Sequence, residues 1–320
     1  MSRLCLLMTI AVATVVFAGA ADAAQVTAER SEKGVVVKID GQRFTEYLTR
    51  SGNKPVLWPI IGPTGKPMTR AYPMAEGKDE KKDHVHQRSM WFTHGSVNGI
   101  SFWDERGKPG TIEHREFLRI ESGPEAVIVT RNDWVGPDGK KQCEDERTLS
   151  FGVDGQTRRI DFDITLCATA GPVRFGDTKE GTMALRIAQT MTVDAKQGGR
   201  IVNSEGLTDQ NAWGKKAAWV DYHGPVDGQI VGIAVLNHPT SFRYPTHWHV
   251  RTYGLFTANP FGWHDFEGAK AKVDGSYTLP AGKTITLRYR VLFHLGDEKT
   301  ARIAEAFAKY AGKSRQSGRD

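Results

Sequence analysis

The chain has 320 residues, of which 39% are hydrophobic and 25% are charged, and its formal net charge is +6. This composition is ordinary for a globular protein, so it disfavours a disordered chain, a collagen-like chain and a polytopic membrane protein. The Lys and Arg residues are scattered and rarely form runs, so we do not expect a nucleic-acid partner.

The first 23 residues have the pattern of a secretory signal peptide. Arg3 precedes an apolar stretch from Leu4 to Phe17, and a small-x-small cleavage site, Ala21-Asp22-Ala23, follows. The apolar stretch is shorter than the roughly 20 residues of a membrane span, which disfavours the alternative of an uncleaved anchor helix. We therefore expect an exported protein, periplasmic or extracellular, whose mature form has no integral membrane association.

The rest of the chain is dominated by short runs that predict strands. Turn dipeptides such as Asp40-Gly41, Asp154-Gly155 and Asp274-Gly275 separate these runs, which is typical of antiparallel strands. The predicted strands are 35–39, 43–48, 56–61, 126–132, 148–151, 158–168, 183–193, 230–236, 250–256 and 284–294. We predict an all-β fold, a single large antiparallel β-sandwich domain over 24–311, followed by a polar flexible tail over 312–320.

One stretch has a helical pattern. From Glu298 to Ala311 the apolar residues recur at helical spacing, with Asp297 as a plausible N-cap and Gly312 beyond the end. We expect this C-terminal helix to pack against the outside of the last sheet.

The two cysteines beyond the signal peptide, Cys143 and Cys167, flank the hairpin predicted at Asp154-Gly155. Strand alternation places Cys143 on the core face, together with Leu149, and Cys167 on the opposite face. A disulfide would need a β-bulge between them, so we predict two free thiols.

Most of the histidines fall in three segments that also contain Arg, Trp, Gly and Pro. These segments are Asp83 to Trp103, Asn237 to Arg251, and Ala258 to His264. In an extended chain, the spacing of His84 and His86, and of His247 and His249, points both imidazoles of each pair to one side. The two pairs together offer ligands for a divalent transition metal, with Glu180 to complete the shell, although the spacing is weakly specific.

The competing chemistry needs no metal. A histidine and a carboxylic acid that face each other across a pocket can move protons to and from a sugar oxygen. We take Glu180 and Asp221 as the acids, although both are equally well explained as exposed loop residues. Arginine side chains would orient hydroxyls or a carboxylate, and exposed tryptophan rings would stack on a sugar.

The candidate residues follow from these considerations. The catalytic candidates are His84, His86, His94, Glu180, Asp221 and His249, and the substrate-binding candidates are Arg88, Trp91, Asn98, Trp103, Arg186, Trp248, Arg251 and Asn259. For Trp58 and Trp134 we favour a place in the core.

The same segments resemble a bacterial family of unknown function that is labelled PmoA-like, or "methane oxygenase PmoA". The resemblance lies in Asp83 to Phe102-Trp103, Glu180 to Arg186, Trp219 to Tyr222, His238-Pro239, Trp248 to Leu255 and Asn259 to Gly262. Gln87 stands where the family usually has a second consecutive histidine. The mean hydropathy of −0.44 excludes the membrane subunit of a methane monooxygenase. For the fold, the resemblance implies a sandwich similar to the galactose-mutarotase-like supersandwich.

We therefore predict an exported carbohydrate-active protein that uses His and carboxylate acid–base chemistry on a sugar or glycoside, as an epimerase, lyase or hydrolase. Its partner would be a small-molecule or oligosaccharide substrate. Two alternatives stay open, a metal-dependent enzyme with His ligands and a non-catalytic glycan-binding protein of the cell envelope.

Overall fold

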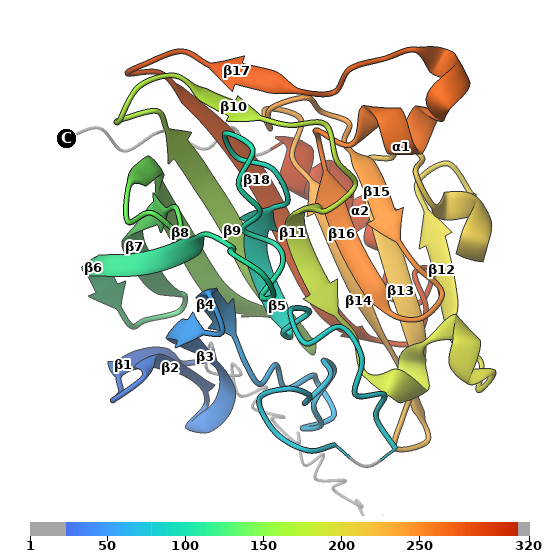
Figure 1. The fold of residues 1–320 in the computed structure, drawn as a ribbon. Coiled ribbons are helices and arrows are strands. Elements are labelled where there is room, and N and C mark those ends of the chain that lie inside the picture. The colour runs from blue at the N-terminus through green and yellow to red at the C-terminus, as the bar shows by residue number, and fades with distance from the viewer. Residues whose placement is uncertain (1–23, 78, 313–320) are drawn as a thin grey trace, which may run out of the picture.

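The computed structural model describes residues 24–77 and 79–312 (Figure 1). The predicted signal peptide and residues 313–320 of the predicted tail lie outside the described residues. Two eight-stranded antiparallel sheets form the body of the protein, and a two-stranded ribbon lies at one end. The all-β prediction is confirmed.

The first sheet contains the N-terminal strands and the strands near the histidine-rich segments. In spatial order they are β1 (Val26–Arg30), β2 (Gly34–Ile39), β3 (Gln42–Ser51), β4 (Lys54–Leu57), β5 (Met90–His94), β11 (Gly181–Arg186), β16 (Leu255–Asn259) and β15 (His247–Val250). Because β5 pairs with β11, residues near 90 meet residues near 185.

The second sheet contains the long hairpin strands from the middle of the chain. In spatial order they are β12 (Arg200–Asn203), β13 (Trp219–Val226), β14 (Gln229–Asn237), β18 (Thr284–Leu295), β9 (Thr157–Cys167), β8 (Lys141–Asp154), β7 (Ala126–Val135) and β6 (Thr111–Glu121). The ribbon pairs β10 (Val173–Phe175) with β17 (Tyr277–Leu279).

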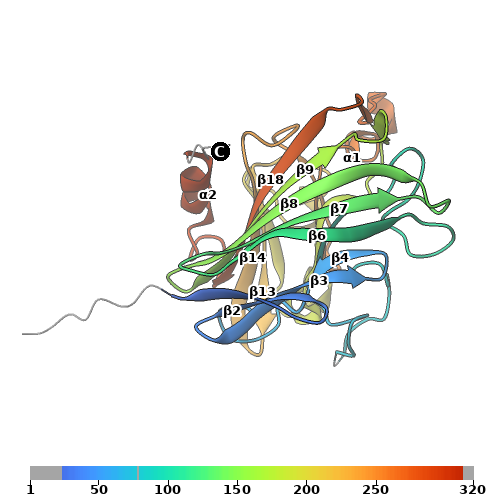
Figure 2. The same ribbon diagram turned by 90° about the vertical axis from the view of Figure 1, so that its left-hand side faces the viewer.

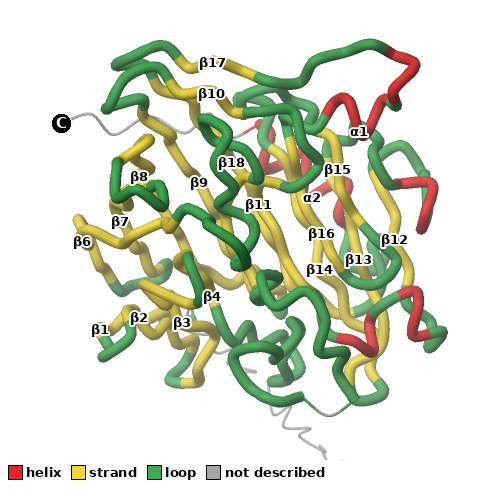
Figure 3. The backbone as a smooth tube through the Cα atoms, in the orientation of Figure 1, coloured by secondary structure: helices red, strands yellow, loops and turns green. Residues whose placement is uncertain are grey.

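The helices are short and lie at the periphery (Figure 3). They are α1 (Trp263–Glu267), α2 (Ile303–Gly312) and the 3-10 helices Gln189–Met191, Val193–Ala195, Asp209–Ala212 and Ala269–Ala271. Of the helices that the structure describes, none combines the length and the apolarity that a membrane crossing needs. Helix α2 lies on the outer side of the second sheet, as expected (Figure 2).

The core fills the space between the two sheets because strand side chains alternate between the faces. On β9, Ile160, Phe162, Ile164 and Leu166 are at most 2% exposed and belong to this core. The outer face of each sheet buries a smaller apolar cluster. On the first sheet the cluster lies around Trp91, Trp103 and Ala184, and on the second sheet it lies under α2.

Several predicted elements have different bounds. The run 183–193 is a strand only as far as Arg186, and the run 250–256 contains the turn between β15 and β16. The regular helix begins at Ile303, because Asp297 caps a preceding turn through the backbone N–H of Thr300. Gly312 lies in its last turn. The prediction of two free thiols is confirmed.

Candidate functional site

A hollow of about 400 Å³ lies on the outer face of the first sheet, and we call it the histidine pocket. It is lined by His84, His86, Gln87, Trp103, Asp104, Lys179, Glu180, His249, Arg251 and Tyr253. The structure thus brings together His84, Glu180 and Arg251, which are far apart in the sequence. Five segments supply the lining: the loops that follow β4 and β5, the residues before β11, strand β15 and the turn that follows it.

Two buried arginines hold the loop that carries His84 and His86. Arg186 donates hydrogen bonds to Gln87 Oε1 at 2.6 Å and to Asp83 Oδ1 at 3.2 Å. Arg70 donates to the same Asp83 oxygen at 2.6 Å and to the carbonyls of His84 and Gln87. Burial opposes the charge of Asp83, but Arg186 and Arg70 outweigh it and lower the pKa of that carboxyl. Arg186 therefore positions the pocket loop and lies below its lining.

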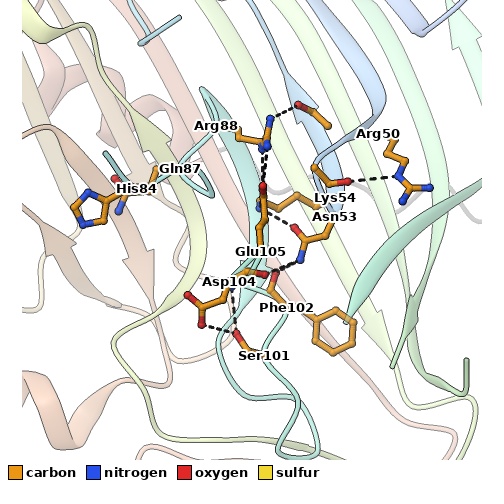
Figure 4. Close-up of polar contacts among 12 residues, drawn as sticks. Arg50, Asn53, Lys54, His84, Gln87, Arg88, Ser101, Phe102, Asp104 and Glu105 are labelled. Atoms are coloured by element: carbon orange, nitrogen blue, oxygen red, sulfur yellow. Dashed lines mark hydrogen bonds and ion pairs between the residues drawn. The ribbon is translucent and has the colours of Figure 1, made fainter. Parts of the chain in front are cut away.

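A second buried network holds the wall that carries Trp103 and Asp104. Glu105 accepts two hydrogen bonds from Arg88, both at 2.7 Å, and one from Lys54 Nζ at 2.9 Å. Asn53 donates to the carbonyls of Phe102 and Asp104. Figure 4 shows Glu105 between Arg88 and Lys54, with His84 and Gln87 to one side. Arg88, a predicted substrate-binding residue, is therefore engaged by Glu105 instead.

Aromatic rings form much of the pocket lining. The rings of His84 and Tyr253 are stacked, with centroids 5.4 Å apart and planes 9° from parallel. His86 lies 5.9 Å from Trp103, and Trp103 rests on Trp91 at 5.4 Å. Trp91 is only 1% exposed, so it supports the pocket from below and is not among the lining residues.

Burial sets the charge states of the pocket. It lowers the pKa of His86 and of His249 to about 4, so both imidazoles are neutral near pH 7. The ring nitrogen Nδ1 of His249 lies 3.0 Å from the carbonyl of Lys179, which can only accept, so Nδ1 carries the proton and Nε2 has a free lone pair. Burial also raises the pKa of Glu180, with a further contribution from Asp104, while Lys179 opposes it.

Strand alternation directs two predicted residues away from the pocket. On β5, the side chain of His94 faces the core between the sheets. Its ring centroid lies 4.9 Å from that of Phe261, and its Nε2 atom is hydrogen-bonded to the carbonyl of Gly176 at 2.9 Å. On β15, Trp248 faces the same core and is completely buried. The period of two residues that brings His249 to the pocket excludes its neighbour Trp248.

The tertiary structure separates three other predicted residues from the pocket. Asp221 lies on β13 in the second sheet, where it is buried and hydrogen-bonded to His223 and His294. Asn98 lies at a loop tip and bonds Gln142. Asn259 is buried and donates to the carbonyl of Thr178, so it anchors the segment that leads to Glu180.

Sequence reasoning missed four lining residues as candidates, namely Gln87, Asp104, Lys179 and Tyr253. Three of them are immediate neighbours of predicted residues in the chain, since Gln87 follows His86, Asp104 follows Trp103 and Lys179 precedes Glu180. Tyr253 lies in the turn after Arg251. The sequence could have indicated these lining residues only through their position next to a predicted residue. This signal is weak, because neighbouring residues in a strand usually face opposite sides.

The pocket histidines do not form a metal-ligand cluster within the part of the chain that the structure describes. His247 turns to Glu267, with its Nε2 atom 2.7 Å from the carboxylate, and does not line the pocket. The single group of three ligand atoms within 4.8 Å of one another among the described residues is Asp221, His223 and Glu298, in the second sheet. The expected joining of the two histidine pairs around one ion is therefore not seen.

A family model described as "Family of unknown function (DUF6807)" matches residues 34–308. The chain belongs to this family. The family description does not mention PmoA, so the PmoA-like label stays a prediction. No curated protein matches the chain significantly.

Several solved structures are similar in arrangement. An α-galactosidase from Lactobacillus brevis is 8% identical over 90% of this chain and 42% of its own, with a TM-score of 0.38. A galactose mutarotase-like protein from Clostridium acetobutylicum is 8% identical over 85% of this chain and 98% of its own, with a TM-score of 0.36. A glycoside hydrolase family 97 enzyme from Pseudoalteromonas sp. strain K8 is 10% identical over 84% of this chain and 34% of its own, with a TM-score of 0.33. This chain thus spans less than half the length of the two hydrolases.

Proposed function

We propose that the chain is a sugar-directed acid–base enzyme of the epimerase, lyase or hydrolase type, and that the histidine pocket is its active site. One observation carries the proposal. A carboxyl group with a raised pKa, two neutral imidazoles, a guanidinium and aromatic rings line the same hollow of about 400 Å³. This combination suits a sugar, because sugars offer hydroxyl groups at their edges and C–H groups on their faces.

The residues divide the work according to their charge states. Glu180 is the proton donor, because burial keeps its carboxyl protonated to a higher pH than usual. His249 accepts a hydrogen bond from a substrate hydroxyl at Nε2, since its Nδ1 proton is held by the Lys179 carbonyl. An imidazole whose pKa is about 4 is a weak base, so proton transfer falls to Glu180 and not to His86 or His249.

The stacked pair of Tyr253 and His84 presents ring surfaces to the substrate, while Trp103, which is 1% exposed, backs the pocket wall. Arg251 is exposed at the rim and donates hydrogen bonds to hydroxyl or carboxylate oxygens. We also infer export of the chain to the periplasm or the cell exterior, on the basis of the signal-peptide pattern. Amino-terminal sequencing of protein from the cell envelope tests this point, and a terminus that retains residues 1–23 would contradict it.

The test is a substrate screen with matched variants. Purified chain is incubated with reducing sugars and aryl glycosides in D2O, and NMR follows ring-proton exchange, epimer formation and bond cleavage. Glu180→Gln keeps the shape of the side chain and is expected to lower turnover by roughly a hundredfold or more. Glu267→Gln, on an acid outside the pocket, is the matched control and should keep full turnover.

The wild-type rate is expected to fall as pH rises through the raised pKa of Glu180, because the donor proton is then lost. Full turnover by Glu180→Gln would overturn the assignment. Saturable quenching of tryptophan fluorescence by a glycan, without turnover of any sugar in the screen, would indicate the glycan-binding alternative instead.

A further inference from the structure

A second hollow, of about 650 Å³, lies beside the turn that leads into α2, on the outer face of the second sheet. We call it the α2 cavity. Its lining includes Arg200, Trp219, His223 and Glu298, and it shares no residue with the histidine pocket. The inference drawn from it does not depend on the function proposed above.

Beneath the α2 cavity a buried carboxylate lies between two imidazoles, of which His223 lines the cavity. Asp221 Oδ1 lies 2.7 Å from His223 Nδ1, and Asp221 Oδ2 lies 2.7 Å from His294 Nε2. Asp221 is completely buried, and the two histidines are 7% and 1% exposed. Such a buried carboxylate needs several partners, and here both of its oxygens have one.

Three neighbouring strands are arranged so that this contact is possible. Gly232 on β14 is paired with His223 on β13 and with His294 on β18, so these residues form one row across the sheet. A Cβ atom on Gly232 would lie 2.2 Å from the His294 ring. The glycine therefore leaves the space through which the His294 ring reaches Asp221 across the middle strand.

The carboxylate of Glu298 approaches His223 from outside the sheet. Glu298, in the turn before α2, places Oε2 3.7 Å from His223 Nδ1. The ligand atoms of Asp221, His223 and Glu298 all lie within 4.8 Å of one another. A transition metal with bonds of about 2.0–2.2 Å holds neighbouring ligands roughly 3 Å apart. Ligation therefore requires Glu298 to move closer and the hydrogen bond between His223 Nδ1 and Asp221 Oδ1 to open.

We propose that Asp221, His223 and Glu298 bind a divalent transition metal ion at the floor of the α2 cavity. Imidazole nitrogen and carboxylate oxygens suit zinc, manganese or iron. Metal binding releases the proton that His223 Nδ1 shares with Asp221 Oδ1, so that both atoms can turn to the ion. His294 still donates to Asp221 Oδ2, which is how an outer partner orients a carboxylate ligand. The positions that the protein leaves open face the α2 cavity, where water or an oxygen ligand completes the shell.

Isothermal titration of the metal-free full chain with ZnCl2, and separately with MnCl2, tests the site. We expect one equivalent of at least one ion to bind with a Kd of about 10 µM or tighter. Glu298→Gln, whose side chain is partly exposed and whose fold circular dichroism verifies, should weaken binding by roughly tenfold or more. Glu305→Gln is the control, because Glu305 lines the same cavity and pairs with Arg302 but lies outside the ligand trio.

A second readout is the visible absorption of the Co²⁺-loaded chain. A change of this spectrum in Glu298→Gln, with an unchanged spectrum in Glu305→Gln, would support direct ligation. The proposal is overturned if neither Zn²⁺ nor Mn²⁺ binds at about 1 mM, or if Glu298→Gln binds the ion as tightly as the wild type does. In that case Asp221, His223 and His294 form a hydrogen-bonded network that only joins the strands.

Discussion

The buried lysine behind the pocket wall offers a sharp test of the structure. Lys54 on β4 is 0% exposed and pairs with Glu105, and burial lowers its pKa from 10.5 to about 8. Between these two pH values the unfolded chain holds a proton that the folded chain has released, so this lysine makes the folded state more stable as pH rises. The full effect of the shift on the free energy of unfolding is about 3 kcal/mol.

The perturbation is Lys54→Met, which removes the titrating group and leaves Glu105 bound by Arg88. Guanidinium unfolding of both proteins is measured from about pH 7 to about pH 10.5. The stability of the wild type minus that of Lys54→Met should increase by about 3 kcal/mol across this range, because tyrosine titration and the other pH effects cancel in the difference. Lys283→Met, on an exposed lysine, is the control and should show no such trend. A flat difference for Lys54→Met would refute the burial argument.

Three further predictions concern packing and reactivity. Gly232→Ala should lower the free energy of unfolding by about 2 kcal/mol in thermal or denaturant melts, because the new Cβ collides with the His294 ring, and an unchanged melt would contradict this packing. Arg186→Met should cost about 3 kcal/mol in the same measurement, since it removes two hydrogen bonds to the pocket loop and leaves the buried Gln87 Oε1 without this donor. A loss below about 0.5 kcal/mol would argue against this role. In native protein Cys167 should react with a thiol reagent, while Cys143 stays protected until unfolding, because Cys143 is buried and the pKa of its thiol is strongly raised. Equal reaction rates of the two cysteines would contradict the register of β8 and β9.

Local patterns account for the parts of the fold that the sequence predicts well. The alternation on β9 and the turn at Asp154-Gly155 define the β8–β9 hairpin, and the pairing of Asp154 with Thr157 confirms it. The same alternation correctly separates the two cysteines. Strand alternation did not reveal the turn from Arg251 to Gly254, which lies inside the predicted strand 250–256. This turn has no Asn-Gly or Asp-Gly dipeptide to mark it.

The candidate site was predictable in part for the same reason. Clusters of His, Arg and Trp indicate segments that approach a pocket, and members of the first two clusters do line it. The third cluster, Ala258 to His264, supplies no lining residue. Within a cluster, however, the choice of residue depends on which face of a strand it occupies. His249 and Trp248 are adjacent, yet the first lines the pocket and the second lies in the core.

The sequence by itself determined the antiparallel β class, the β8–β9 hairpin, the free thiols and the presence of segments able to carry chemistry. These properties depend on periodicity and composition within a few residues, which any local stretch of chain displays. Only the tertiary structure decided that Glu180 meets His84 and that Asp221 joins His223 and His294 in the other sheet. Those meetings depend on strand pairings between residues far apart in the chain, such as His94 with Gly181, and no local pattern specifies such a partner.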